Sequence, residues 1–309
     1  MMTAPWVQSL RELHDDHFGF DWDSHVRRLN LRLGLTDRDE FGLPAPGLPP
    51  AWFVGDVEGL RPGEWVLVIS LNQARREEDE GWHQAQHYTR QSYWDHWRFL
   101  NRNWWEPRFY RPLVRLASSA LGGLVDTRHE SDFATTHMIF VELCPYASRQ
   151  FTLSGDTLST LAETDLGFRL SARVRRLLIE QASPALVLVN GRAAIDDFQR
   201  LERDHVYLEE RRYTSVSRPE YSLWHREGTY NTQQGSVPVI GFPFLRRPSN
   251  HNSYAEIEQL AATARHLCGQ QVMRSAPCYP PPRMARPITF NSSVAFTPSK
   301  IGSTRASTT

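Results

Sequence analysis

Four short runs of apolar residues, each the length of a buried β-strand, do most to limit the folds open to this chain. They cover Trp65–Leu71, His137–Leu143, Ala185–Val189 and Val237–Phe242. A run that is apolar on both faces is typical of a parallel strand covered by helices on both sides. Helix-like sequence separates the runs, which favours βαβ units. We therefore predict an α/β fold with three layers, α/β/α, around a central, mostly parallel four-stranded sheet.

Both ends of the chain differ from this central pattern. Apolar residues at helical spacing between Val7 and Phe18 predict an N-terminal helical arm, and the proline-rich segment 42–50 predicts a loop after it. Residues 253–268 have an apolar face and predict a closing helix. The sequence after Ser275 is rich in Pro, Ser and Thr, which is typical of disorder. The predicted division is an arm and loop over 1–50, an α/β domain over 51–275 and a disordered tail over 276–309.

Composition argues against several classes of protein. Lys plus Arg and Asp plus Glu both number 35, so any surface that attracts DNA must be local. The three cysteines, Cys144, Cys268 and Cys278, form no CxxC pair, which disfavours a disulfide framework, a zinc ribbon and an iron–sulfur cluster. The sequence shows neither a signal peptide nor an apolar run of membrane-spanning length. We therefore expect a cytoplasmic protein without membrane association.

Cofactor motifs are also missing. The chain has no GxGxxG and no GxxxxGK[ST], so neither a dinucleotide site nor a P-loop is expected. His83 and His87 have the i, i+4 spacing of zinc ligands, but no HExxH and no third ligand accompany them, so metal binding is the weaker interpretation. The segment 82–110 interleaves aromatic residues with arginines; we expect most of it to pack in the core and part to line a pocket. We predict no cofactor and no metal.

Polar residues follow all four apolar runs. The residues after the carboxyl ends of the strands form the binding site of an open parallel sheet. The four segments in question are SLNQA at 70–74, ELCPYASR at 142–149, NGRAA at 190–194 and RRPSNHN at 246–252. We therefore predict that these segments meet at one edge of the sheet.

In this order, over roughly residues 60–268, the four segments resemble the strand-end motifs of the uracil-DNA glycosylase superfamily. In that superfamily the strands end in G-x-N-P or G-x-D-P, in N-x-x-P-Y/F-R-S, in L-G-x-x-A and in H-P-S. This chain departs from the pattern where Gln73 and Ala74 follow Asn72, and where Arg247 replaces the His of H-P-S. Both departures fall on catalytic parts of the motifs.

The resemblance implies an enzyme that removes a base from DNA, with DNA as its partner. Asn72 would position the attacking water, although an ordinary strand-end turn is the alternative for an Asn at such a place. Arg247 or His251 would supply positive charge near the departing base. The expected catalytic residues are Asn72, Arg247 and His251, the expected substrate-binding residues are Glu142, Tyr146, Ser249 and Asn250, and the expected DNA-binding residues are Arg246 and Arg247.

Glu142 bears on which base is removed, because it stands where the superfamily has an Asn that reads the uracil edge. An ionised Glu only accepts hydrogen bonds, so it would repel O4 of uracil and accept from the N4 amine of cytosine. The sequence therefore favours a modified cytosine of phage DNA over uracil, and a role in phage defence. The alternative for Glu142 is a structural ion pair with an arginine such as Arg149.

Two other classes of function stay open. One is a catalytically silent nucleic-acid-binding protein on the same scaffold, because fold does not fix function. The other is a small-molecule nucleoside or nucleotide hydrolase. Asn72 distinguishes the first from an enzyme, and competition by free nucleoside distinguishes the second from a DNA glycosylase.

Overall fold

The computed structural model describes residues 4–72, 85–98, 107–245, 251 and 253–275. Four of its strands are parallel and adjacent, in the order β2-β1-β3-β6. Their bounds are Val66–Ser70 for β1, Met138–Glu142 for β2, Leu186–Asn190 for β3 and Gly235–Phe242 for β6. All four predicted strands are present, and the parallel pairing that their apolar sequences indicated is confirmed.

The sheet has six strands in the described part of the chain, so the prediction of a four-stranded sheet was wrong. Strands β4, Val206–Thr214, and β5, Ser222–Thr232, extend it in antiparallel fashion to the order β2-β1-β3-β6-β5-β4. Most side chains of β4 are exposed, and its sequence VYLEERRYT is largely polar. Unbroken apolar runs mark strands that are buried on both faces, and a strand of this kind has no such run.

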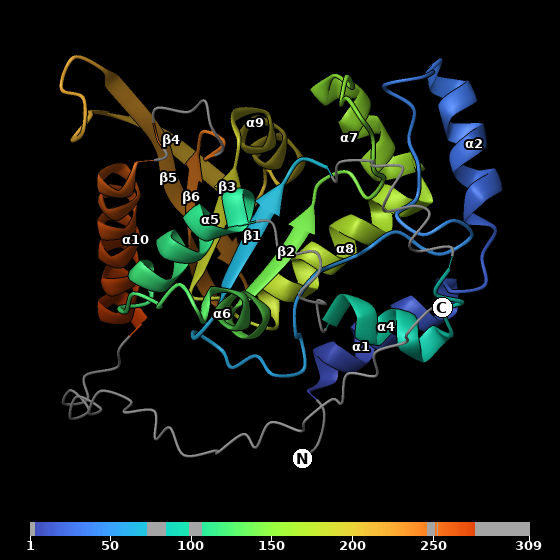
Figure 1. Ribbon diagram of the computed structural model, residues 1–309, viewed down its shortest axis with the longest axis horizontal. Coiled ribbons are helices and arrows are strands. Elements are labelled where there is room, and N and C mark those ends of the chain that lie inside the picture. Colours follow the sequence, from blue (N-terminus) through green and yellow to red (C-terminus); the bar gives the residue numbers. More distant parts are fainter. Residues whose placement is uncertain (1–3, 73–84, 99–106, 246–250, 252, 276–309) are drawn as a thin grey trace, which may run out of the picture. The chain divides into compact units, whose positions relative to one another are not determined.

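Helices cover both faces of the sheet, which gives the three layers expected (Figure 1). One face packs against α5, Pro107–Ala120, α6, Glu130–His137, and α10, Tyr254–Ser275. The other packs against α1, Pro5–His17, α2, Trp22–Leu33, α7, Gly155–Thr164, α8, Leu166–Glu180, and α9, Arg192–Leu201. Each face has its own hydrophobic cluster, because side chains alternate between faces along a strand.

The N-terminal residues form two helices that contribute to the main core. Trp6, Val7 and Leu10 of α1 are buried in the same cluster as the sheet residues. The second helix, α2, was not predicted; the carboxylate of Asp21 caps its start by accepting from the backbone N–H of Ser24 at 3.0 Å. The predicted disordered tail, 276–309, lies outside the described residues.

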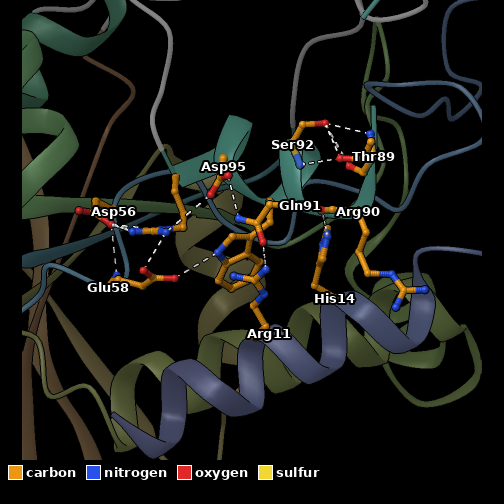
Figure 2. Close-up of polar contacts among 11 residues, drawn as sticks. Arg11, His14, Asp56, Glu58, Thr89, Arg90, Gln91, Ser92 and Asp95 are labelled. Carbon is orange, nitrogen blue, oxygen red and sulfur yellow. Dashed lines mark hydrogen bonds and ion pairs between the residues drawn. The ribbon is translucent and has the colours of Figure 1, made fainter. Parts of the chain in front are cut away.

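The aromatic segment contributes the helix α4, Arg90–Arg98. Its buried aromatic side chains are Tyr93, Trp94 and Trp97. Charged groups gather beside this helix (Figure 2): Arg98 donates to Asp56 at 2.8 Å and lies 2.8 Å from Glu58, while Arg11 of α1 donates to Gln91. For the described part of the segment, the expected role in core packing is confirmed.

Candidate functional site

Three polar residues form a row at the carboxyl edge of the parallel strands. Ser70 ends β1 and lies opposite Glu142, the last residue of β2. Ile69 lies opposite Val189, so the next residues, Ser70 and Asn190, are level as well. The residues two positions earlier in these strands belong to the cluster with α5 and α10, so the row faces that layer. We call Glu142, Ser70 and Asn190 the strand-end row.

Glu142 has a buried carboxyl oxygen without a partner. Its Oε2 has no hydrogen bond, and Glu142 takes part in none of the ion pairs found among the described residues, including the expected one with Arg149. Burial raises the pKa of Glu142 from its ordinary value of 4.5 to about 8. At pH 7 this raised pKa favours the protonated, neutral form of the side chain, which has one donor and one acceptor.

Asn190, on the other side of β1, also has a buried side-chain oxygen without a partner. The residue is 3% exposed, and its Oδ1 has no hydrogen-bond partner within the described part of the structure. A buried polar atom without a partner costs about 1–3 kcal/mol of stability. Two such atoms at one edge of a sheet make that edge a candidate site, where a ligand or an ordered water would supply the missing hydrogen bonds.

Asn72 lies two residues beyond β1 and is tied to the segment after β2. The main chains stay paired past the strands, since Cys144 N–H donates to the carbonyl of Leu71 at 2.8 Å. The Asn72 Nδ2 donates to the hydroxyl of Ser148 at 2.7 Å, and Ser148 is buried. This bond fixes the orientation of the amide. The structure thus brings together Asn72 and the second motif, as the sequence predicted.

Tyr146 is a core residue, so its expected role in stacking on an extruded base is wrong. The side chain is completely buried, in contact with the rings of Phe41 and Phe168. Its hydroxyl donates to Oδ1 of Asp165 at 2.8 Å, and that carboxylate also contacts His25. A ring enclosed by core side chains and held by its hydroxyl cannot present a face to a base.

His251 is also held in a structural contact. Its Nε2 lies 3.1 Å from the carbonyl oxygen and 3.3 Å from the backbone nitrogen of Trp224 on β5. Burial lowers the pKa of His251 more than the bond to the Trp224 carbonyl raises it. The ring is therefore neutral at pH 7, which corrects the expectation that it supplies positive charge. The other expected residues of its loop, Arg246, Arg247, Ser249 and Asn250, lie outside the described residues.

Several residues at this edge were not among the predicted site residues. Asn190 and Ser70 end their apolar runs, and that position alone was the signal that could have selected them. Arg192 stacks on the ring of Trp224, with the guanidinium carbon 4.4 Å from the ring centroid. No sequence signal pointed to Trp224, because its strand, β5, was not predicted.

No family model and no curated protein sequence matches this chain. The site is therefore interpreted from its own geometry. Among the described residues, no group of three or more His, Cys, Asp or Glu side chains is arranged to hold a metal ion. His83, whose spacing from His87 resembles that of zinc ligands, lies outside those residues. None of the described helices is long and apolar enough to cross a membrane.

Proposed function

We propose that this protein is a DNA glycosylase that hydrolyses the N-glycosidic bond of a flipped-out pyrimidine. The observation that carries the proposal is the pairing of two features at one sheet edge: the fixed amide of Asn72, and the unpartnered acid of Glu142. Asn72 follows β1, and Glu142 ends the adjacent parallel strand β2. Membership of the uracil-DNA glycosylase superfamily is part of the same proposal, and it rests on the four motif segments that follow the parallel strands.

In the proposed reaction, Asn72 holds the water. The bond between C1′ and the base nitrogen breaks, its electron pair leaves with the base, and the water oxygen adds to C1′ of the cationic sugar. The proton that the water loses passes through solvent to the base anion. In this proposal the carbonyl oxygen of Asn72 accepts from the water, and Nδ2 donates to Ser148. An amide is too weak a base to take the proton early, which suits a reaction whose sugar is already positively charged at the transition state.

Glu142 reads the edge of the base in its acid form. An acid donates one hydrogen bond and accepts another. It can donate to O4 and accept from N3–H of uracil, or donate to N3 and accept from the N4 amine of cytosine. The preference for cytosine inferred from the sequence assumed an ionised carboxylate, and burial removes that assumption. A modified cytosine of phage DNA stays within the proposed substrate class, and uracil returns to it.

The DNA backbone is bound locally in this proposal. The chain carries no net charge, so phosphate contacts must come from particular cations. Arg246 and Arg247 are proposed for this role from their place in the fourth motif. Flipping a nucleotide out of the DNA stack costs a few kcal/mol, and binding of the base by the protein must offset that cost.

The test is to incubate the protein with oligonucleotides that carry uracil or a 5-substituted cytosine, as single strands and duplexes, and to detect abasic sites. We expect base release by the wild type, and release about 100-fold slower or more by Asn72→Ala. The matched control is Gln234→Ala, which alters an exposed amide in the turn between β5 and β6. It should release bases at the normal rate.

Each other outcome supports one alternative. DNA binding without any abasic site on either base would overturn the enzymatic proposal and favour a silent nucleic-acid-binding protein. Efficient cleavage of free nucleosides, with DNA ignored, would favour a small-molecule nucleoside hydrolase. Release of purines at rates equal to pyrimidines would contradict the role proposed for Glu142.

A further inference from the structure

Strand β4 ends the sheet on the side away from β2, and among the described residues β5 is its one neighbouring strand (Figure 1). Just before β4, the carbonyl of His205 accepts from the N–H of Asn231 on β5 at 2.8 Å. Just after β4, the N–H of Ser215 donates to the carbonyl of Tyr221 at 3.0 Å. Hydrogen-bonded pairs alternate along antiparallel strands, so the odd-numbered residues of β4 bond to β5. The even-numbered residues point their N–H and C=O groups outwards.

The outer edge of β4 carries a row of unpaired backbone groups. In the part of the chain that the structure describes, neither the N–H nor the C=O of these residues has a backbone partner: Leu208, Glu210, Arg212 and Thr214. Val206 differs, because its N–H donates to the carbonyl of Glu202 at 2.8 Å. A row of free N–H and C=O groups at the edge of a sheet is a template for pairing with another strand.

The side chains of this edge carry both signs of charge in a self-complementary order. Glu209 and Glu210 precede Arg211 and Arg212, and all four are exposed. When two copies of this strand run antiparallel, the acidic part of each lies beside the basic part of the other. An edge of a single sign would repel a second copy, since like charges directly opposite destabilise a strand pair. The order Glu-Glu-Arg-Arg therefore favours an identical strand as the partner.

We propose that β4 pairs in antiparallel fashion with β4 of a second copy of this chain, so that two six-stranded sheets become continuous. The two-fold axis passes beside Arg211. Glu210 then lies opposite Arg212 of the partner subunit, and Leu208 lies opposite the partner's Thr214. Every residue of the unpaired row thus meets another member of the row, and each such pair exchanges both of its backbone hydrogen bonds.

The ion pairs already present on β4 favour this register over the neighbouring one. Arg211 stands opposite its own copy, but its guanidinium lies 2.8 Å from Glu209 and 2.9 Å from Glu227 of β5, which balance its charge. A register centred on Glu210 would instead place two Glu210 carboxylates opposite each other. The ion-pair partner found for Glu210 among the described residues is Arg212, at 2.9 Å. Two carboxylates with one arginine each repel more than two arginines with two carboxylates each.

Exposed apolar side chains at the two ends of β4 come together in the same arrangement. Tyr207, near the start of the strand, is 72% exposed, and Val216, in the loop after its end, is 57% exposed. Antiparallel pairing brings the start of one β4 beside the end of the other. Tyr207 then lies opposite Ser215 of the partner subunit, in the segment that contains the partner's Val216. Burial of these side chains adds an apolar contribution at each end of the charged centre.

The test is sedimentation velocity of the full chain over a range of about 1–100 µM. We expect an equilibrium between monomer and dimer that weakens as the salt concentration rises, because salt screens exposed charges. Glu210→Arg and Arg212→Glu should each weaken the dimer about 30-fold, since each places like charges opposite each other at two symmetry-related positions. The matched control is Glu163→Arg, a charge reversal at an exposed position of α7, which should dimerise as the wild type does.

Two further samples show whether the charges meet across the interface. The double variant Glu210→Arg/Arg212→Glu exchanges the two signs and keeps the strand self-complementary, so it should dimerise as the wild type does. An equimolar mixture of the two single variants should form a heterodimer, because each basic strand then meets an acidic one, and this result also shows that both variants are folded. A wild type that stays monomeric at every concentration, a dimer unchanged in both single variants, or a mixture that does not associate would overturn the proposal.

Discussion

Replacement of Glu142 by Gln should stabilise the protein, and by an amount that grows with pH. Glu142 stays protonated in the folded state up to a pKa of about 8, whereas in the unfolded chain the group ionises near 4.5. Between these values the unfolded state gains stability from ionisation and the folded state does not. Each pH unit in this window therefore lowers the free energy of unfolding by about 1.4 kcal/mol. Gln does not ionise, so the free energy of unfolding of the variant does not fall with pH in this way.

The magnitude follows from the width of the window. At pH 5 the wild type and Glu142→Gln should differ by less than about 1 kcal/mol, and at pH 7 the variant should be more stable by roughly 3 kcal/mol. The total approaches ~5 kcal/mol at pH 8 and above, an upper bound, because relaxation around a buried charge reduces it. The difference should be measured by urea unfolding at pH 5, 6, 7 and 8.

Glu163→Gln is the matched control, because Glu163 is an exposed residue of α7. Its stability should follow that of the wild type at every pH. If Glu142→Gln instead differs from the wild type by a constant amount across the range, the carboxyl group is ionised in the folded protein. Glu142 would then not be the neutral acid that the site requires.

Four further results are expected. Base release by the wild type should fall as the pH rises through about 8, the pKa of Glu142. Release by Glu142→Gln should not fall, because the amide keeps a donor and an acceptor at every pH. Parallel pH profiles of the two proteins would contradict this prediction. Asn72→Ala should lower the single-turnover rate of base release about 100-fold or more at unchanged DNA affinity, since it removes a group needed mainly in the transition state. Tyr146→Phe should lower the free energy of unfolding in urea by roughly 1–3 kcal/mol, because the buried Asp165 loses a hydrogen-bond donor. Its rate of base release should equal that of the wild type. A slower release at full stability would show that Tyr146 belongs to the site. Replacing both Arg246 and Arg247 by Ala should weaken DNA binding and flatten its dependence on salt, and an unchanged slope would move the DNA surface elsewhere.

The parallel half of the fold could be predicted from the sequence. Strands β1, β2, β3 and β6 are buried between two layers of helices, so their sequences must be apolar at nearly every position, and that pattern is visible without a structure. Strand β4 lies at the edge of the sheet, and β5 lies next to it. Their side chains tolerate charge on the exposed face, so neither strand has the unbroken apolar run that marked the others.

The same distinction applies to the site. The order of the four strand ends, and the presence of Asn72, Glu142 and Asn190 at three of them, are properties of the sequence. The structure alone decided that Tyr146 is enclosed, that His251 is bound to Trp224, and that burial raises the pKa of Glu142. Burial and partners set a side chain's accessibility and its pKa, and both depend on residues far away in the chain. The residue types at the sheet edge could therefore be predicted from the sequence, but the accessibility and the pKa of their side chains could not.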